Sequence, residues 1–127
     1  MIDGLFNQPS YLAAKKTLDA VAVRQQAIAN NIANLETPGY KRLDLAPTFS
    51  AELNRACASG DPQQIAALHP TLAPDPTAVP NSKDGNSVSL ENEMMQLNQN
   101  TMAHTVETQM LSSLLMRMKM AITGKSS

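Results

Sequence analysis

The chain has 127 residues, a net charge of −1 and an aromatic content of 3%, with no tryptophan. This length allows one domain at most, and so few aromatic side chains leave few large anchors for a compact core. The near-neutral charge excludes the basic surface that nucleic acids or anionic membranes attract, so we expect no nucleic-acid partner.

Residues 1–8 lack the basic region and the apolar run of a cleavable signal peptide. No run of about eighteen apolar residues follows, so we do not expect the chain to span a membrane. By themselves, these features favour the cytoplasm.

The first predicted helix covers residues 9–36, and Pro9 suits its first position. Residues at steps of three and four form a heptad seam along it. Gln25 is the polar residue of this seam, where it either fixes the register of a helix pair or lies at the edge of the apolar stripe; both interpretations remain open. The seam consists of Tyr11, Ala14, Leu18, Val21, Gln25, Ile28, Ile32 and Leu35.

Three asparagines, Asn30, Asn31 and Asn34, precede a turn at Pro38 and Gly39. Asparagine lowers helix stability by about half a kcal/mol relative to alanine, so local propensity does not account for them. Their carboxamides donate and accept hydrogen bonds, and we expect them to bond to a neighbouring chain. Pro38 disfavours helical angles at the residue before it, and Gly39 supplies the positive φ that a type II turn requires.

Residues 37–60 are predicted to contain this turn, an extended connector and a short helix that is capped by Thr48 and runs to about Ala58. Residues 61–86 include five prolines, and their apolar residues show no period. We therefore expect residues 61–86 to form a flexible linker without regular structure.

The last predicted helix covers residues 87–123, with Ser89 as its cap. Glu91 and Glu93 lie in its first turn, where the helix dipole favours negative charge. A seam again steps by three and four residues, and a second apolar stripe beside it indicates a second set of neighbours. The seam consists of Leu90, Met94, Leu97, Thr101, His104, Thr108, Leu111, Leu115, Met118 and Ile122, and the stripe of Met95, Met102, Val106 and Met110.

No residue pattern indicates catalysis or a metal site. His69 and His104 have no clustered ligands, and Glu91 and Glu93 point in different directions on a helix. Cys57 has no nearby base and is interpreted as a small packed hydrophobe. We expect a protein that is not an enzyme, with no cofactor, no metal and no small-molecule substrate.

Two stretches of the chain resemble one known family. Residues 24–42, RQQAIANNIANLETPGYKR, strongly resemble the N-terminal signature shared by flagellar rod and hook proteins. Residues 84–94, DGNSVSLENEM, are similar to the segment that opens the C-terminal helix in proximal rod members of that family. The family usually has an aspartate at the cap of this helix, where Ser89 can act in the same way.

The resemblance implies a structural subunit of the flagellar proximal rod, which would contact other rod proteins, the basal ring and the export gate and would transmit torque. It also implies export by the flagellar type III system, to the periplasmic side where the cell has an outer membrane, with residues 1–8 as a disordered N-terminal export region. This conflicts with the cytoplasmic location favoured above, and we follow the resemblance. Two alternatives are another rod or hook protein of the family and a cytoplasmic helical adaptor.

We therefore predict an all-α fold whose N- and C-terminal helices pair as an antiparallel coiled coil, with a short middle helix and a long irregular linker. We expect the isolated subunit to be marginally stable and to become ordered when it packs against neighbouring subunits.

The methionines of the last helix either fill an ordinary core or adapt to unequal neighbours. The segment 40–42 is a basic contact or a solvated turn exit, and the resemblance favours the contact. Residues expected at subunit interfaces are Gln25, Asn30, Asn31, Asn34, Pro38, Gly39, Tyr40, Leu90, Glu93, Leu97, Leu111 and Leu115.

Overall fold

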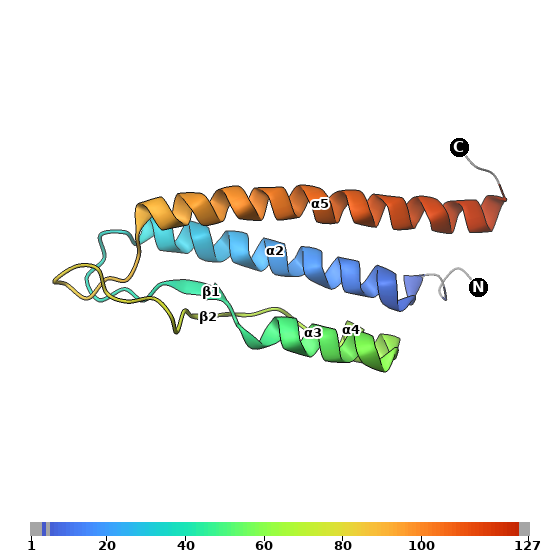
Figure 1. The fold of residues 1–127 in the computed structure, drawn as a ribbon, viewed down its shortest axis with the longest axis horizontal. Coiled ribbons are helices and arrows are strands. Elements are labelled where there is room, and N and C mark those ends of the chain that lie inside the picture. Colours follow the sequence, from blue (N-terminus) through green and yellow to red (C-terminus); the bar gives the residue numbers. More distant parts are fainter. Residues whose placement is uncertain (1–3, 5, 125–127) are drawn as a thin grey trace.

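Two long helices dominate the computed structural model, which describes residue 4 and residues 6–124. Helix α2 spans Pro9–Ala33 and helix α5 spans Leu90–Thr123. They lie side by side and run in opposite directions in an elongated molecule (Figure 1). The predicted packing of two long terminal helices in a mostly helical fold is confirmed. Part of the predicted N-terminal region, residues 1–3 and 5, lies outside the described residues.

Helix α2 begins and ends where its local sequence favours it. Pro9 is the first helical residue, a position at which the missing N–H is not needed. The helix ends at Ala33, short of the predicted residue 36, and the Asn34 N–H closes its last turn. Gly39 then has a φ of 73°, as predicted, so the chain can leave the helix axis there without the steric cost that a Cβ would impose.

Two short helices and two short strands form a layer below α2 and α5 in Figure 1. Strand β1 spans Leu43–Leu45, helix α3 spans Thr48–Ser59, helix α4 spans Pro62–Ala66 and strand β2 spans Leu72–Pro74. The strands pair antiparallel, with Leu43 opposite Pro74 and Leu45 opposite Leu72. The predicted short helix is present as α3, but its N-cap is Pro47, and Thr48, the predicted cap, is its first helical residue.

The fold is not purely α-helical, and the prediction that residues 61–86 lack regular structure is wrong, because α4 and β2 lie in this range. Pro62 stands in the first turn of α4, where its missing N–H costs nothing. The Asp61 side chain caps this helix by accepting a hydrogen bond from the Gln63 N–H at 2.9 Å. Ile65 has no exposed surface, so burial of one apolar side chain anchors the short helix.

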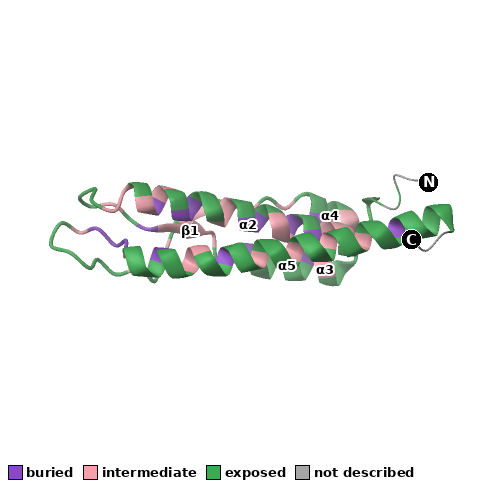
Figure 2. Ribbon diagram, turned by 90° about the horizontal axis from the view of Figure 1, so that it is seen from above, coloured by how far each residue is buried: buried purple, intermediate pink, exposed green. Residues whose placement is uncertain are grey.

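The core is a narrow strip along α2, whereas α5 is exposed over most of its length (Figure 2). The seam predicted for α2 is buried at Ala14, Val21 and Ile28, but Gln25 is exposed. No helix in the described part of the chain is long and apolar enough to cross a membrane.

The seam predicted for α5 is displaced around the helix. Thr101, His104 and Thr108 are exposed, whereas Glu93 and Asn100 are buried. The prediction followed the three-and-four spacing of the apolar residues toward both ends of α5, which placed polar residues in the middle of the seam. It was wrong here because Glu93 and Asn100 find hydrogen-bond partners on α2 and in the layer below, which offset the cost of burying polar groups.

Candidate functional site

The two segments that the sequence singled out, residues 24–42 and 84–94, meet in space. Their backbones hydrogen-bond to each other just after α2 ends and just before α5 begins. We call this contact the junction. Its backbone bonds run from the Gly39 N–H to the Asp84 carbonyl at 2.8 Å and from the Ser87 N–H to the Tyr40 carbonyl at 3.1 Å.

Asn86 closes the C-terminal end of α2 from the other side of the junction. Its Nδ2 lies 3.0, 3.1 and 2.8 Å from the carbonyl oxygens of Asn34, Leu35 and Thr37. Its Oδ1 accepts a hydrogen bond from the Val88 N–H at 2.7 Å. Carbonyls at a helix end have no partner within the helix, and this buried carboxamide supplies one.

Replacing Asn86 with alanine is expected to lower the free energy of unfolding by about 1 to 3 kcal/mol, because three carbonyls at the end of α2 lose a donor and the buried Val88 N–H loses its acceptor. Urea denaturation followed by circular dichroism measures this loss. Asn92→Ala is the matched control, since Asn92 is exposed on α5 and should change stability by no more than about 0.5 kcal/mol. Equal effects of the two substitutions would contradict the capping role.

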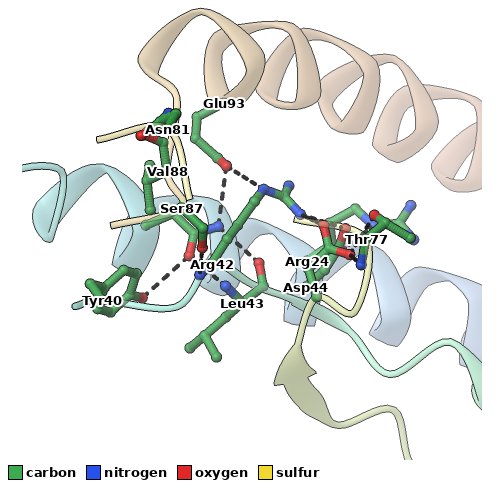
Figure 3. A network of polar contacts seen from close by, with 12 residues as sticks. Arg24, Tyr40, Arg42, Leu43, Asp44, Thr77, Asn81, Ser87, Val88 and Glu93 are labelled. Atoms are coloured by element: carbon green, nitrogen blue, oxygen red, sulfur yellow. Dashed lines mark hydrogen bonds and ion pairs between the residues drawn. The ribbon is translucent and has the colours of Figure 1, made fainter. Parts of the chain in front are cut away.

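Glu93 forms the centre of the junction. Its side chain extends from α5 toward Arg42, which lies on the segment leading into β1 (Figure 3). The Arg42 Nε donates to Glu93 Oε1 at 2.5 Å, and the Asn31 Nδ2 donates to Glu93 Oε2 at 3.2 Å. Glu93 has no exposed surface, and a carboxylate can be buried in this way only if it is paired and hydrogen-bonded.

Asn31 connects α2 to β1, because its side chain bonds to both backbone polar groups of one β1 residue, as the backbone of a neighbouring strand would. Its Nδ2 donates to the Leu43 carbonyl and its Oδ1 accepts from the Leu43 N–H, both at 2.8 Å. The Tyr40 hydroxyl also donates to Asn31 Oδ1, at 3.2 Å. One fully buried carboxamide thus contacts the turn, the strand and, through Glu93, the last helix.

Arg42 extends the network to β1 and to the residue that follows β2. Its Nη1 donates to Asp44 Oδ2 at 3.1 Å and to Asp75 Oδ2 at 2.8 Å. On the other side, the Arg24 Nε donates to Asp44 Oδ1 at 3.3 Å. Arg42 therefore lies against carboxylates from β1, from α5 and from the residue that follows β2, and it holds these three segments together.

The charges of the network shift the pKa of several members. Burial lowers the pKa of Arg42, but its hydrogen bonds to Glu93 and Asp44 outweigh burial, and the net shift is upward. Burial raises the pKa of Asp75, but the hydrogen bonds from Thr77 and Arg42 outweigh burial, and the net shift of this pKa is downward. These directions favour the charged forms of Arg42 and Asp75, as expected for a closed ion-pair network.

The arrangement holds chain segments in place. The guanidinium and the buried carboxylate bond to each other, and the Asn31 carboxamide uses both of its polar atoms within the junction. An open cleft of about 710 Å³ lies beside the network, between the segment after β2 and the first turns of α5. Among the described residues, no group of three or more His, Cys, Asp or Glu side chains could hold a metal ion.

The structure brings four of the predicted interface residues together in the junction: Asn31, Gly39, Tyr40 and Glu93. The Asn34 side chain bonds locally, donating to the Asn30 carbonyl at 2.8 Å and accepting from the Thr37 hydroxyl at 3.1 Å. The others are spread along the molecule. Gln25, Pro38, Leu90 and Leu115 are exposed, and Asn30, Leu97 and Leu111 are half-buried.

The sequence proposed the segment 40–42 as a basic contact, and its Arg42 is a buried member of the network. Asn86 of the junction and Asn100 of α5 were not proposed from the sequence. Asn86 lies inside one of the two family-like segments, so membership of that segment was the signal that could have found it. Asn100 lies seven residues after Glu93, on the same face of α5. A search for polar residues at heptad spacing would have found it.

The fold and the junction define a mostly helical chain whose two long helices are held together by buried polar contacts, and comparison with known proteins identifies its class. Residues 12–41 match the family model described as flagella basal body rod protein. This range contains most of α2 and the turn that follows it.

Relatives from several bacteria narrow this class. The chain is 31% identical to the flagellar basal body rod protein FlgB of Borrelia hermsii, over 75% of this chain and 82% of that protein. It is 33% identical to FlgB of Escherichia coli K12, over 77% of this chain and 81% of that protein. With FlgB of Salmonella typhimurium the identity is 29%, over 87% of this chain and 90% of that protein. The chain belongs to the FlgB family of flagellar basal body rod proteins, and it is a structural rod subunit and not an enzyme.

Proposed function

We propose that this chain is a subunit of the proximal part of the flagellar rod and that the exposed apolar face of α5 packs against neighbouring subunits. The face consists of Met95, Met102, Val106 and Met110, whose exposed fractions are 50%, 69%, 53% and 51%. We call it the methionine face. It is the stripe that the sequence placed beside the seam, and it is the single observation on which the proposal rests.

A row of apolar side chains on a long exposed helix favours association, because contact with another helix removes it from water. Methionine side chains are flexible and polarizable, so one such face can adapt to neighbours of different shape. This suits a shaft whose subunits contact unlike proteins above and below. Other rod proteins, the basal ring and the export gate are the partners that we propose.

The junction has a different role in this proposal. Asn31 and Glu93 are fully buried, so in the isolated subunit they act by positioning α5 and not by touching a neighbour. Gln25, Pro38, Gly39, Leu90 and Leu115 have exposed surface that an adjacent subunit can contact. The paired α2 and α5 would continue as a coiled coil between subunits and carry torque along the shaft, after export through the type III apparatus.

Introducing a charge on the methionine face tests this function. Met102→Glu is expected to leave the helical content unchanged, since Met102 is exposed, and to prevent stable packing of α5 against a neighbour. In cells, the variant is expected to abolish motility and to be missing from detergent-extracted basal bodies.

Thr108→Glu is the matched control, because Thr108 is an exposed polar residue of the same helix that lies six residues from Met102 and therefore on another side of α5. It is expected to support motility and to be recovered in basal bodies. Normal incorporation of Met102→Glu would refute the proposed packing face. Absence of the unmodified chain from basal bodies would refute the rod function itself.

A further inference from the structure

The middle of the α2–α5 pair contains a second polar contact, seven residues along α5 from Glu93. The Asn100 Nδ2 donates to the Val21 carbonyl at 3.1 Å and to Gln25 Oε1 at 2.9 Å. Asn100 is 3% exposed, so this contact lies inside the helix pair. Gln25, which the sequence left as either a register-fixing residue or an edge residue, is exposed and nevertheless bonds across the pair.

The apolar contacts of this pair do not define its alignment strongly. Ala14, Ala20 and Ala27 are among the buried residues of α2, and such small side chains form a smooth surface. Burial of apolar area is non-directional, so α5 could slide along this surface by one heptad, about 10 Å, at little cost in apolar contact. Directional bonds are needed to select one alignment.

Glu93 and Asn100 meet partners of opposite hydrogen-bonding character. Glu93 accepts from two donors, Arg42 and Asn31. Asn100 donates to two acceptors, both of them oxygens on α2. A slide by one heptad in one direction would place the Glu93 carboxylate against those acceptors, and a slide in the other direction would leave Arg42 facing a neutral carboxamide.

We infer that Glu93 and Asn100 set the register of α5 on α2 as a pair of complementary polar contacts, and that neither residue can take the place of the other. A carboxylate has no proton to donate to the Val21 carbonyl, and a carboxamide does not neutralise Arg42. Single buried polar residues fix register in other helix pairs in the same way, at a cost in stability.

Asn100 shows the cost in stability of such a register-fixing contact. Its Oδ1 is buried and has no hydrogen-bond partner within the described structure. A buried acceptor without a donor destabilises the folded state, so an apolar residue at this position would be more favourable for stability alone. The asparagine is thus explained by alignment and not by stability.

Spin-label distances test the inference on the full chain. Labels at Gln26 of α2 and Gln109 of α5, both exposed, are introduced with Cys57→Ser so that the native thiol does not react. The unmodified pair and each single variant, Glu93→Leu or Asn100→Leu, are expected to give one distance. The double variant is expected to give at least two, which differ by up to about 10 Å. A single, unchanged distance in the double variant would overturn the inference.

Thermal unfolding gives a second measurement that remains decisive if the double variant does not fold. Asn100→Leu is expected to raise the midpoint of unfolding, and the isosteric Asn100→Asp to lower it, because its carboxylate would face two acceptors. Asn98 is exposed on the same helix, so Asn98→Leu and Asn98→Asp are the controls and should leave the midpoint nearly unchanged. An Asn100→Asp variant as stable as the unmodified chain would show that the two contacts are interchangeable.

Discussion

Replacing Arg42 with methionine is expected to lower the free energy of unfolding by about 3 to 5 kcal/mol, the range observed when one partner of a buried ion pair is removed. Glu93 would keep its fully buried carboxylate and lose the Arg42 guanidinium, retaining the bond from Asn31. Asp44 and Asp75 would lose the same guanidinium. Urea denaturation at neutral pH, followed by circular dichroism, measures the change.

Two further variants isolate the cause. Lys41→Met removes an exposed cation next to Arg42 and should change stability by less than about 0.5 kcal/mol. The double variant Arg42→Met with Glu93→Leu should recover part of the loss, because no buried charge then remains. If the Arg42 and Lys41 variants were equally stable, the ion pair would contribute nothing to the fold.

Replacing Asn31 with alanine is expected to lower the free energy of unfolding by about 3 kcal/mol, since several buried partners lose a hydrogen bond together. The Leu43 N–H and carbonyl and the Tyr40 hydroxyl all bond to this carboxamide. Hydrogen exchange should report the change locally, because the Leu43 amide would lose its acceptor and exchange faster.

Asn30→Ala provides the matched control on the same helix turn. Asn30 is half-buried, and its side chain has no hydrogen bond in the described structure. Because alanine is the better helix former, we expect this variant to be as stable as the unmodified chain or more stable by about 0.5 kcal/mol. A loss equal to that of Asn31→Ala would contradict the special role of Asn31.

The asparagines illustrate how far sequence reasoning reached for the site. Their low helix propensity correctly marked the end of α2 as unusual, but the predicted partner was a neighbouring chain. Asn31 instead bonds to Glu93, 62 residues away in the sequence, and Arg42 bonds to Glu93 across 51 residues. No local pattern encodes such pairings, because they depend on how distant segments pack.

The local features of the chain were determined by the sequence alone. Residue spacing and end signals predicted α2, α3 and α5, Gly39 marked the turn, and two short segments indicated the family. Propensity and periodicity act between residues a few positions apart, so they can be recognised without a fold. The tertiary structure decided which face of α5 is buried, that β1 and β2 pair, and that α4 forms around Ile65. Each of these depends on a partner from a distant part of the chain, and a buried polar or isolated apolar side chain is stable only once that partner is in place.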